Sequence, residues 1–323
     1  MHNHRHDGRE GQGRVPTIGT TGPVSVGKGT GLLFAPATSL DPMRYGATLF
    51  VTDVSIQPVQ LALALEERGF DSLWVPEHTH IPASRVTPPP TGDAELAEEY
   101  RRCLDPFVSL TAAAAVTERL RVGTGIALIA QRDPIVTAKA AASLDWVSGG
   151  RFTLGVGYGW NVEEMADHGV DPRRRRARAR EHLLAMRRLW EDETASYHGE
   201  YVQLPESWSW PKPVQCPLPV LIGGAAGPTL FSHIAEFAEG WIPIGGHGLA
   251  EAVPRLKATV EAAGRDPSAV QVVPFGSIPD PAKLEHFAQV GVTQCIFRLP
   301  SAPEAVVMPL LDRYATLISE MDM

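Results

Sequence analysis

Short apolar runs alternate with longer amphipathic segments from residue 44 onward, and this alternation predicts the secondary structure. Strands are predicted over 44–51, 71–75, 120–125, 152–156, 220–222, 241–244, 270–275 and 294–299. Helices are predicted over 58–68, 105–118, Pro134 up to the Gly149-Gly150 pair, 174–193, from 228 onward, 249–263, 281–290 and 303–321, with a hairpin-like excursion over 196–204. Regular strand–helix alternation indicates a parallel sheet covered by helices, and eight such units match one α/β domain, a single (β/α)8 TIM barrel.

The rival architecture for such an alternation is an open, doubly wound sheet that binds a dinucleotide. That fold usually carries a GxGxxG turn directly after its first strand. Here Gly155, Gly157 and Gly159 follow the fourth predicted strand instead, and Trp160 fills the place of the last glycine. The sequence therefore favours the barrel over the open sheet.

Residues 1–42 differ from the rest of the chain because they are rich in glycine and show no helical or strand period. Such a segment cannot bury enough apolar surface to offset its ordering entropy. We predict a disordered extension over 1–42 and a single domain over 43–323. Because Met43 directly precedes the first predicted strand, we hypothesise that the functional protein starts there.

Two motifs in this extension imitate functional sites. His2, His4 and His6 are interpreted as polar residues of a tail and not as a metal site. Residues 22–28 read GxxxxGK, the first part of a phosphate-binding loop. However, Gly29 replaces the hydroxyl residue that would hold magnesium, and no strand precedes the loop, so we reject that assignment.

The composition argues against several classes of protein. The chain of 323 residues is 44% hydrophobic and 20% charged, as globular proteins are, and its net charge of −8 disfavours a nucleic-acid partner. Cys103, Cys216 and Cys295 form no CxxC pair, so we predict no metal site and no disulfide framework. The chain lacks an apolar stretch of membrane-spanning length and the apolar centre of a signal peptide. We therefore expect a cytoplasmic protein without a membrane partner.

The loops that follow the strands build the active site in barrels of this kind. Glu77, His78 and His80 come directly after the second predicted strand. Imidazole is the side chain best matched to proton transfer near neutral pH, so His78 and Glu77 are candidate catalytic residues. The alternative is a structural histidine held by a carboxylate. The loop over 79–104 is long and rich in proline, which is typical of a lid or a substrate wall.

Glycines and aromatic residues mark the ends of the next two strands. The third strand is followed by Thr124-Gly125-Ile126, and the fourth by Gly157-Tyr158-Gly159-Trp160. Glycine at a strand end allows close approach of a backbone, and an aromatic side chain offers a face to a planar ring. The alternative is a tight turn that glycine merely permits.

The fifth strand leads through Gly223-Gly224-Ala225 into a helix that begins at Pro228. The free N–H groups and the dipole at a helix N-terminus favour a phosphate there, so we predict an anion site, with an uncapped helix start as the alternative. The arginines of 173–180 are interpreted as a solvated helical face, and steering of an anionic cofactor tail is a secondary hypothesis. His247, after the sixth strand, is a weaker candidate for contact with substrate.

Several of these segments together resemble the luciferase-like monooxygenase family. They are Asp133-Pro134-Ile135-Val136, Lys139, Ser143-Leu144-Asp145, Ser148-Gly149-Gly150-Arg151 and Gly155-Val156-Gly157-Tyr158-Gly159-Trp160, with Glu66 to Trp74, Pro76-Glu77-His78, Ile222-Gly223-Gly224 and Glu239-Gly240-Trp241. The similarity covers about residues 43–320, and the pattern is most similar to the branch that uses the deazaflavin F420.

The resemblance implies a barrel, usually dimeric, with the cofactor ring lying across the strand ends. It implies that Gly223, Gly224 and Ala225 receive the cofactor phosphate. It also implies that Thr124, Gly125 and Ile126 flank the ring, with a non-proline cis peptide at Gly125–Ile126 as in several relatives.

For the reaction, the resemblance implies that His78 is an active-site histidine oriented by Glu77. Relatives that oxidise sugar phosphates carry a catalytic glutamate next to the Gly-x-Gly turn, where this chain has Trp160. The nearest acids here are Glu163 and Glu164. That departure argues against the sugar-phosphate reaction.

The leading hypothesis from the sequence is an oxidoreductase that exchanges hydride between F420 and a small organic substrate, acting as a homodimer. The first alternative is an FMN-dependent monooxygenase that uses molecular oxygen. The second is a non-catalytic flavin- or deazaflavin-binding protein. Glu77, His78 and His80 at one strand end count against this last interpretation.

Overall fold

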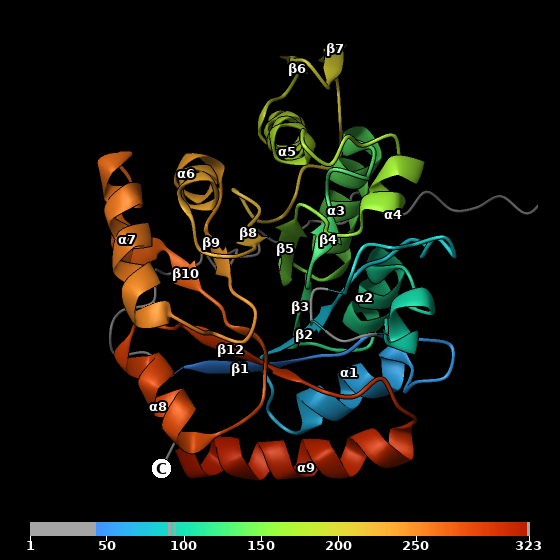
Figure 1. The fold of residues 1–323 in the computed structure, drawn as a ribbon, viewed down its shortest axis with the longest axis vertical. Helices are drawn as coiled ribbons and strands as arrows, with labels where there is room; N and C mark the ends of the chain where they lie inside the picture. Colours follow the sequence, from blue (N-terminus) through green and yellow to red (C-terminus); the bar gives the residue numbers. More distant parts are fainter. Residues whose placement is uncertain (1–42, 90–91, 93–94, 322–323) are drawn as a thin grey trace, which may run out of the picture. The chain divides into compact units, whose positions relative to one another are not determined.

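The computed structural model describes residues 43–89, 92 and 95–321, and Figure 1 traces their fold. The predicted disordered extension over 1–42 lies outside the described residues. So do the three histidines and the glycine-rich loop that imitate functional sites there.

A curled parallel sheet forms the centre of the domain (Figure 1). Its strands are β1 (Arg44–Thr48), β2 (Ser72–Val75), β3 (Arg121–Thr124), β4 (Ala127–Leu128), β5 (Phe152–Gly157), β8 (Val220–Gly223), β9 (Gly240–Ile242), β10 (Gln271–Val272), β11 (Phe275–Ser277) and β12 (Gln294–Arg298). They lie in the order β10-β9-β8-β5-β3-β2-β1-β12-β11, with β4 beside β5. Every pairing in this sheet is parallel, which confirms the predicted parallel sheet.

Helices follow the strands and lie around the outside of the sheet (Figure 1). They are α1 (Pro58–Glu67), α2 (Pro106–Ala115), α3 (Pro134–Val147), α5 (Arg175–Glu191), α6 (Pro228–Phe237), α7 (Leu249–Ala262), α8 (Pro281–Gln289) and α9 (Glu304–Met321). Three of them begin with an Asp-Pro pair: Asp105, Asp133 and Asp280 each accept a backbone N–H of the first turn at 2.8–3.0 Å. An Asp cap followed by proline is a strong local start signal, so the first residues of these helices were predictable to within one position.

Apolar side chains form two layers of core. The larger layer fills the space between the sheet and the helices. The smaller layer lies inside the curl and comprises Trp74, Leu221, Ile242 and Ile296 from four strands, with Val273 from the link between β10 and β11. Because these strands are buried on both faces, they appear in the sequence as continuous apolar runs.

The structure departs from the predicted elements at several places. The strand predicted over 270–275 is divided into β10 and β11 around Pro274, which has no backbone N–H to donate to a neighbouring strand. A short helix, α4 (Val162–Asp167), follows Trp160 and Asn161 where a loop was expected. The loop over 79–104 contains a 3-10 turn, η1 (Glu98–Arg101), and a second such turn is η2 (Pro267–Ala269). The hairpin predicted over 196–204 is confirmed as β6 (Ala195–His198) and β7 (Gln203–Ser207).

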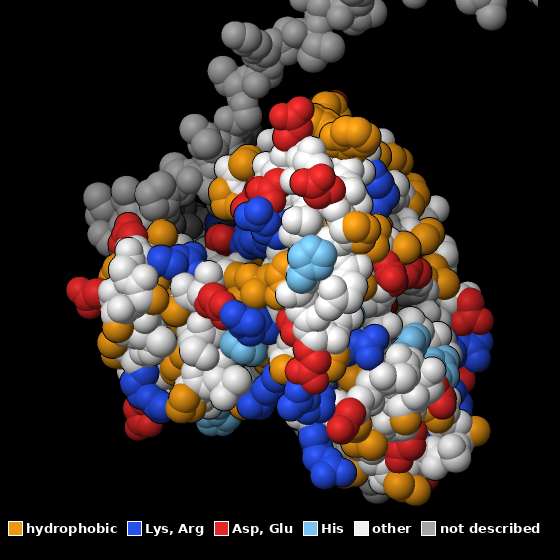
Figure 2. All heavy atoms as spheres, turned by 90° about the horizontal axis from the view of Figure 1, so that it is seen from above, with side chains coloured by type: hydrophobic (Ala, Val, Ile, Leu, Met, Phe, Trp, Pro, Cys, Tyr) orange, Lys and Arg blue, Asp and Glu red, His pale blue; other side chains and the backbone are white. Residues whose placement is uncertain are grey.

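Acidic and basic side chains are interspersed over the face of the domain that Figure 2 draws. Arg174 pairs with Glu200, and Arg180 pairs with Glu236, so part of the arginine run at the start of α5 is matched by carboxylates. Among the described residues, none of the helices combines the length and the apolar character that a membrane span requires.

Candidate functional site

The predicted site residues stand at the C-terminal ends of four strands that are neighbours in the sheet. His78 follows β2, Ile126 follows β3, Trp160 follows β5, and Gly224 follows β8. Because β2, β3, β5 and β8 are adjacent in that order, their carboxyl ends lie along one edge of the curl. The structure therefore brings together segments that are up to 146 positions apart in the sequence.

The centre of this edge is a buried pair formed by His78 and Glu164. The Nδ1 atom of His78 lies 2.7 Å from Oε2 of Glu164, and only 5% and 1% of the two side chains are exposed. The other carboxylate oxygen of Glu164 accepts the backbone N–H of Thr79 at 3.3 Å. Glu164 lies on α4, the short helix that was not predicted, which is why sequence reasoning named it only as a nearby acid.

The hydrogen bond from Trp160 determines the tautomer of the neutral His78 imidazole. The indole N–H of Trp160 donates to Nε2 of His78 at 3.3 Å. An indole nitrogen can only donate, so Nε2 of His78 is the acceptor and the ring proton resides on Nδ1, where it is donated to Glu164. This arrangement leaves a lone pair on Nε2 that is held by one long, weak hydrogen bond.

Aromatic side chains surround the imidazole on its open side. The rings of Tyr100 and Trp160 lie with their centroids 5.4 and 5.7 Å from that of His78. The thiol of Cys103 donates to the carbonyl of His78 at 3.2 Å. Burial raises the pKa of that thiol to about 11, so Cys103 is a structural donor and not a nucleophile at neutral pH.

Glu77 does not orient His78, and that part of the prediction is wrong. Its carboxylate accepts the backbone N–H of Leu128 at 2.7 Å and the Nε–H of Arg132 at 2.6 Å. Arg132 in turn donates to Asp105, the cap of α2. Glu77 therefore ties the loops after β2 and β3 together, and Glu164 takes the position beside His78 that Glu77 was expected to fill.

The peptide bond between Gly125 and Ile126 is cis, which confirms the prediction from the family resemblance. The Ile126 side chain turns toward β5 and β8. A Cβ atom on Gly157 would lie 2.3 Å from Cδ1 of Ile126, and one on Gly223 would lie 3.1 Å from its Cγ2. Gly157 is thus required by the close approach of Ile126, and Thr124 fixes the same corner by donating to the carbonyl of Gly155 at 2.6 Å.

The loop after β8 presents its backbone to the same edge. The carbonyl of Gly224 accepts the indole N–H of Trp241 at 2.8 Å. Because a peptide unit is planar, the N–H of Ala225 points the opposite way, away from Trp241. Ala225 is exposed, and α6 begins three residues later at Pro228, which has no N–H. No side chain of the described residues caps the N–H groups that follow it, so they can receive a ligand.

Tyr158 faces the helices instead of His78. Its hydroxyl lies 2.7 Å from Nδ1 of His233 on α6, and the guanidinium of Arg176 lies over its ring at 5.6 Å. Burial raises the pKa of the Tyr158 hydroxyl to about 12, so it remains protonated. His247 lies exposed between β9 and α7.

Two buried amides beside the glycine turn were not predicted. Both amide atoms of Gln131 and both of Asn161 lack a hydrogen-bond partner in the described part of the chain, although only 9% and 1% of these residues is exposed. A Cβ atom on Gly159 would lie 3.1 Å from Oε1 of Gln131, which puts this amide against the turn. Buried amides without partners are costly, so these two fit the polar edge of a ligand or an ordered water.

The start of the long loop is fastened to α4. Glu163 accepts the backbone N–H groups of Val86 and Thr87 at 2.8 and 3.2 Å and the Thr87 hydroxyl at 2.6 Å. The hydrogen bond from the Thr87 hydroxyl, together with that from the Val86 N–H, lowers the pKa of Glu163 to about 2. This carboxylate is therefore ionised near neutral pH, where it keeps its hydrogen bonds to Val86 and Thr87.

Comparisons with known proteins agree with this geometry. The family model described as "Luciferase-like monooxygenase" matches residues 44–278. The uncharacterized protein Rv0953c of Mycobacterium tuberculosis is 45% identical over 280 residues, which are 86% of this chain and 99% of the relative. An F420-dependent glucose-6-phosphate dehydrogenase of Kineococcus radiotolerans is 32% identical over 211 residues, 63% of this chain and 58% of that protein.

Solved structures share the fold at low sequence identity. An F420-dependent secondary alcohol dehydrogenase, in complex with an F420–acetone adduct, has a TM-score of 0.71 at 18% identity and covers 87% of this chain and 99% of its own. The monooxygenase RslO1 from Streptomyces bottropensis has a TM-score of 0.70 at 19% identity, covering 87% and 100%. With the family model matching most of the chain and a relative 45% identical along nearly its whole length, this protein belongs to the luciferase-like monooxygenase family.

Proposed function

We propose that this protein is an F420-dependent oxidoreductase that exchanges hydride between the deazaflavin and a small organic substrate. The observation that carries the proposal is the buried His78–Glu164 pair at the strand ends, beside the Ile126 corner. Family membership and the F420-dependent relatives at 31–32% identity support the choice of cofactor. When bound, the deazaflavin supplies a carbon that gives or takes hydride.

The residues present fit a flat ring with a phosphate-bearing tail. Ile126 offers an apolar surface for one face of the ring. The orphaned amides of Gln131 and Asn161 suit the polar edge of a heterocycle. Gly223, Gly224 and Ala225, with the uncapped start of α6, would hold the phosphate through backbone N–H groups.

His78 would move the proton that accompanies hydride transfer. Its Nε2 accepts the hydroxyl proton of an alcohol when that carbon loses hydride, and it returns the proton in the reverse direction. The substrate hydroxyl displaces the weak hydrogen bond from Trp160. Glu164, held at 2.7 Å on the far side of the ring, stabilises the imidazolium that forms.

Side-by-side titrations with F420 and with FMN test this proposal, with the fluorescence of each cofactor as the readout. We expect F420 to bind at least about tenfold more tightly than FMN. Gly224→Val should abolish binding because the residue has φ near +151° and a side chain would be strained there. His78→Ala should bind F420 as the native protein does, because its side chain only moves protons.

The other outcomes separate the alternatives. Tighter binding of FMN, with oxygen uptake when reduced FMN is added, would replace the proposal by a monooxygenase. Tight cofactor binding with no turnover of any alcohol, aldehyde or ketone in a broad panel would favour a non-catalytic binding protein. Binding of neither cofactor would remove the assignment of the Gly223–Ala225 loop.

Two structural features of the proposed enzyme extend beyond the site. We propose that the curled sheet closes as a complete (β/α)8 barrel, because the N–H groups of Thr293 and Ile296 reach the carbonyls of Val272 and Pro274 at 3.3 and 2.9 Å.

We also propose a homodimer. Apolar side chains are exposed on α2 and α3, namely Val108, Ile135, Val136, Trp146 and Val147. Sedimentation at micromolar concentration distinguishes the dimer from a monomer of 34.9 kDa.

A further inference from the structure

A guanidinium group lies beside the proposed reaction centre and has no role in the proton relay. Arg85 stands in the loop after β2, and its Cζ atom lies 5.9 Å from the centroid of the Trp160 ring. The Trp160 ring also lies next to the imidazole of His78. Their ring centroids are 5.7 Å apart, and the indole N–H donates to Nε2 of His78 at 3.3 Å. One indole ring therefore separates the cation from the proton-transfer group.

Hydrogen bonds within the loop and to α4 fix the position of Arg85. Its Nη1 donates to the carbonyl of Thr87, within the same loop. Glu163 holds that loop segment through the three hydrogen bonds from Val86 and Thr87. Glu163 and Glu164 are consecutive on α4, so the same short helix fixes both the guanidinium and the imidazole.

In the described part of the chain, no carboxylate forms an ion pair with Arg85. Of the other arginines near the strand ends, Arg132 pairs with Glu77 and Asp105, and Arg298 pairs with Glu99. The nearest acid in the contacts of the loop, Glu163, directs its oxygens at the N–H and hydroxyl groups of Val86 and Thr87. A half-buried guanidinium with free donors, stacked on an aromatic ring, is the arrangement that proteins use to receive a planar or tetrahedral anion.

We propose that Arg85 binds an anionic group of the substrate, so that the substrate is a small organic acid or phosphate ester. The proposal rests on the function proposed above, since it takes His78 as the reacting end. The carboxylate or phosphate contacts the guanidinium beside the Trp160 ring, and a chain of a few carbon atoms reaches Nε2 of His78. Arg85 thereby selects among hydroxy compounds by charge, while His78 and Glu164 act on the hydroxyl.

The indole N–H of Trp160 gives a local readout that requires no turnover. In protein labelled with nitrogen-15 at tryptophan, the Trp160 signal is assigned by its absence from Trp160→Phe. The probes are two matched pairs, 3-hydroxybutanoate with its neutral amide, and glycerol 3-phosphate with glycerol. Each probe is titrated into the native protein, Arg85→Gln and the matched control Arg313→Gln, whose arginine is exposed on α9.

We expect at least one anion to shift the Trp160 signal at a concentration roughly 10-fold to 100-fold lower than its neutral partner, because a hydrogen bond to a charged group is worth that much. Arg313→Gln should keep this preference, and Arg85→Gln should lose it. Which anion binds more tightly distinguishes a carboxylate substrate from a phosphate ester.

Three results would overturn the proposal. The first is equal binding of the anions and their neutral partners to the native protein. The second is an unchanged preference in Arg85→Gln, and the third is an anion that shifts other tryptophan signals but not that of Trp160. The titration is repeated with F420 present, so a failure of the cofactor to bind contradicts the proposed function without altering the result for Arg85.

Discussion

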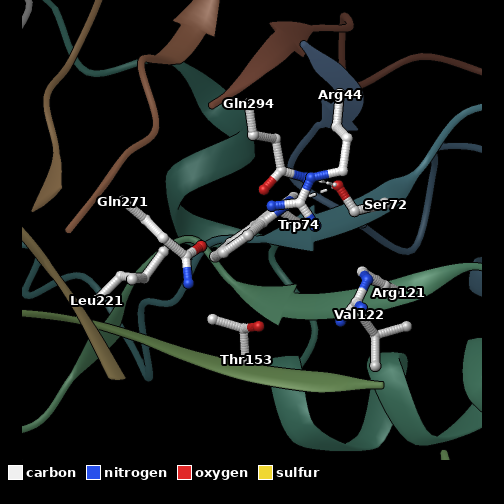
Figure 3. Close-up of a pocket in the computed structure, with 9 residues that line it drawn as sticks. All are labelled: Arg44, Ser72, Trp74, Arg121, Val122, Thr153, Leu221, Gln271 and Gln294. Atoms are coloured by element: carbon white, nitrogen blue, oxygen red, sulfur yellow. Dashed lines mark hydrogen bonds between the residues drawn. The ribbon is translucent and has the colours of Figure 1, made fainter. Parts of the chain in front are cut away.

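At the N-terminal ends of the strands, one group of polar side chains is hydrogen-bonded within itself: Asp71, Ser72, Trp74 and Gln294. Figure 3 shows Gln294, Ser72 and Trp74 meeting there around a cavity of about 10 Å³. The amide nitrogen of Gln294 donates to Ser72 Oγ at 2.6 Å and to Asp71 at 2.7 Å, and the indole of Trp74 donates to the same hydroxyl at 3.0 Å. A cavity of this size holds no more than a single water.

At the C-terminal ends, polar groups are left available. Nε2 of His78 has only one long hydrogen bond, and the amides of Gln131 and Asn161 have none in the described part of the chain. The two ends belong to the same strands. The difference teaches that one end is organised for stability, because its groups are mutually paired, and the other for a ligand, because its groups are not.

Among the substitutions that test this difference between the two ends, His78→Ala should have the largest effect. Loss of a general acid–base group costs about 10²–10⁴-fold in turnover, because no other side chain at the strand ends is positioned to take the proton. Steady-state kinetics with F420 and the substrate found in the panel measures the loss, while cofactor fluorescence verifies that binding is retained. His168→Ala is the matched control, because that imidazole is bonded to Thr79 at the surface. Turnover unchanged in His78→Ala would remove its catalytic role.

Replacement of Glu164 by Gln should lower turnover roughly 10-fold to 100-fold, since a neutral amide no longer stabilises the imidazolium. Nitrogen-15 shifts of His78 report the tautomer directly, with the proton expected on Nδ1 in the native protein. Asp167→Asn, on the same helix, is the control because Asp167 contacts the exposed His80. If Glu164→Gln kept native turnover and pH profile, Glu164 would be structural only.

At the opposite end, Gln294→Leu should cost about 1–3 kcal/mol of unfolding free energy, because Asp71 and Ser72 lose a buried donor. Urea unfolding measures the change, with exposed Gln289→Leu as the control. The turnover number should stay within a factor of about two, because the N-terminal ends of the strands lie opposite the candidate site. A large loss of turnover without loss of stability would contradict the division of roles between the two ends.

The sequence predicted the fold well because its signals are local. An Asp-Pro pair at a helix start and a continuous apolar run in a strand act within a few residues, so the parallel sheet and its helices could be placed. The division of one strand at Pro274 was not predicted. Proline lacks a backbone N–H, and this matters only where a neighbouring strand would accept the hydrogen bond. The small helix α4 was missed because Val162–Asp167 is too short to show a period.

The candidate site was predictable by strand end but not by contact. His78, Ile126 and Gly224 were found because they follow strands whose carboxyl ends must converge. The partner of His78 was not, because Glu164 lies 86 positions away and reaches it only through the direction of α4. Glu77 was the nearer choice in sequence, yet Arg132 and the N–H of Leu128 compete for it in space. The signal available in the sequence for this partner was the pair Glu163-Glu164, which follows Trp160 within four residues.

The smallest expected effect is a difference in pH dependence between the two ends. Burial lowers the pKa of His233, which contacts Tyr158 near the C-terminal ends, and burial raises the pKa of Asp71 at the N-terminal ends, against the opposing effect of Arg44 and Arg121. When the pH falls below about 6.5, the unfolded chain protonates this histidine before the folded one does, so stability decreases. Asp71 acts in the other direction, because the folded state keeps its proton to a higher pH and loses stability as the pH rises from about 4.

Urea unfolding between pH 4 and 8 measures both effects. His233→Gln should flatten the loss of stability below pH 6.5, and Asp71→Asn should flatten the change just above pH 4. Each substitution should leave the other window as it is, because the two groups lie at opposite ends of the sheet and titrate independently. If a single variant altered stability in both pH ranges, the two ends would be coupled. The hydrogen-bonded group at the N-terminal ends would then not be independent of the candidate site at the C-terminal ends.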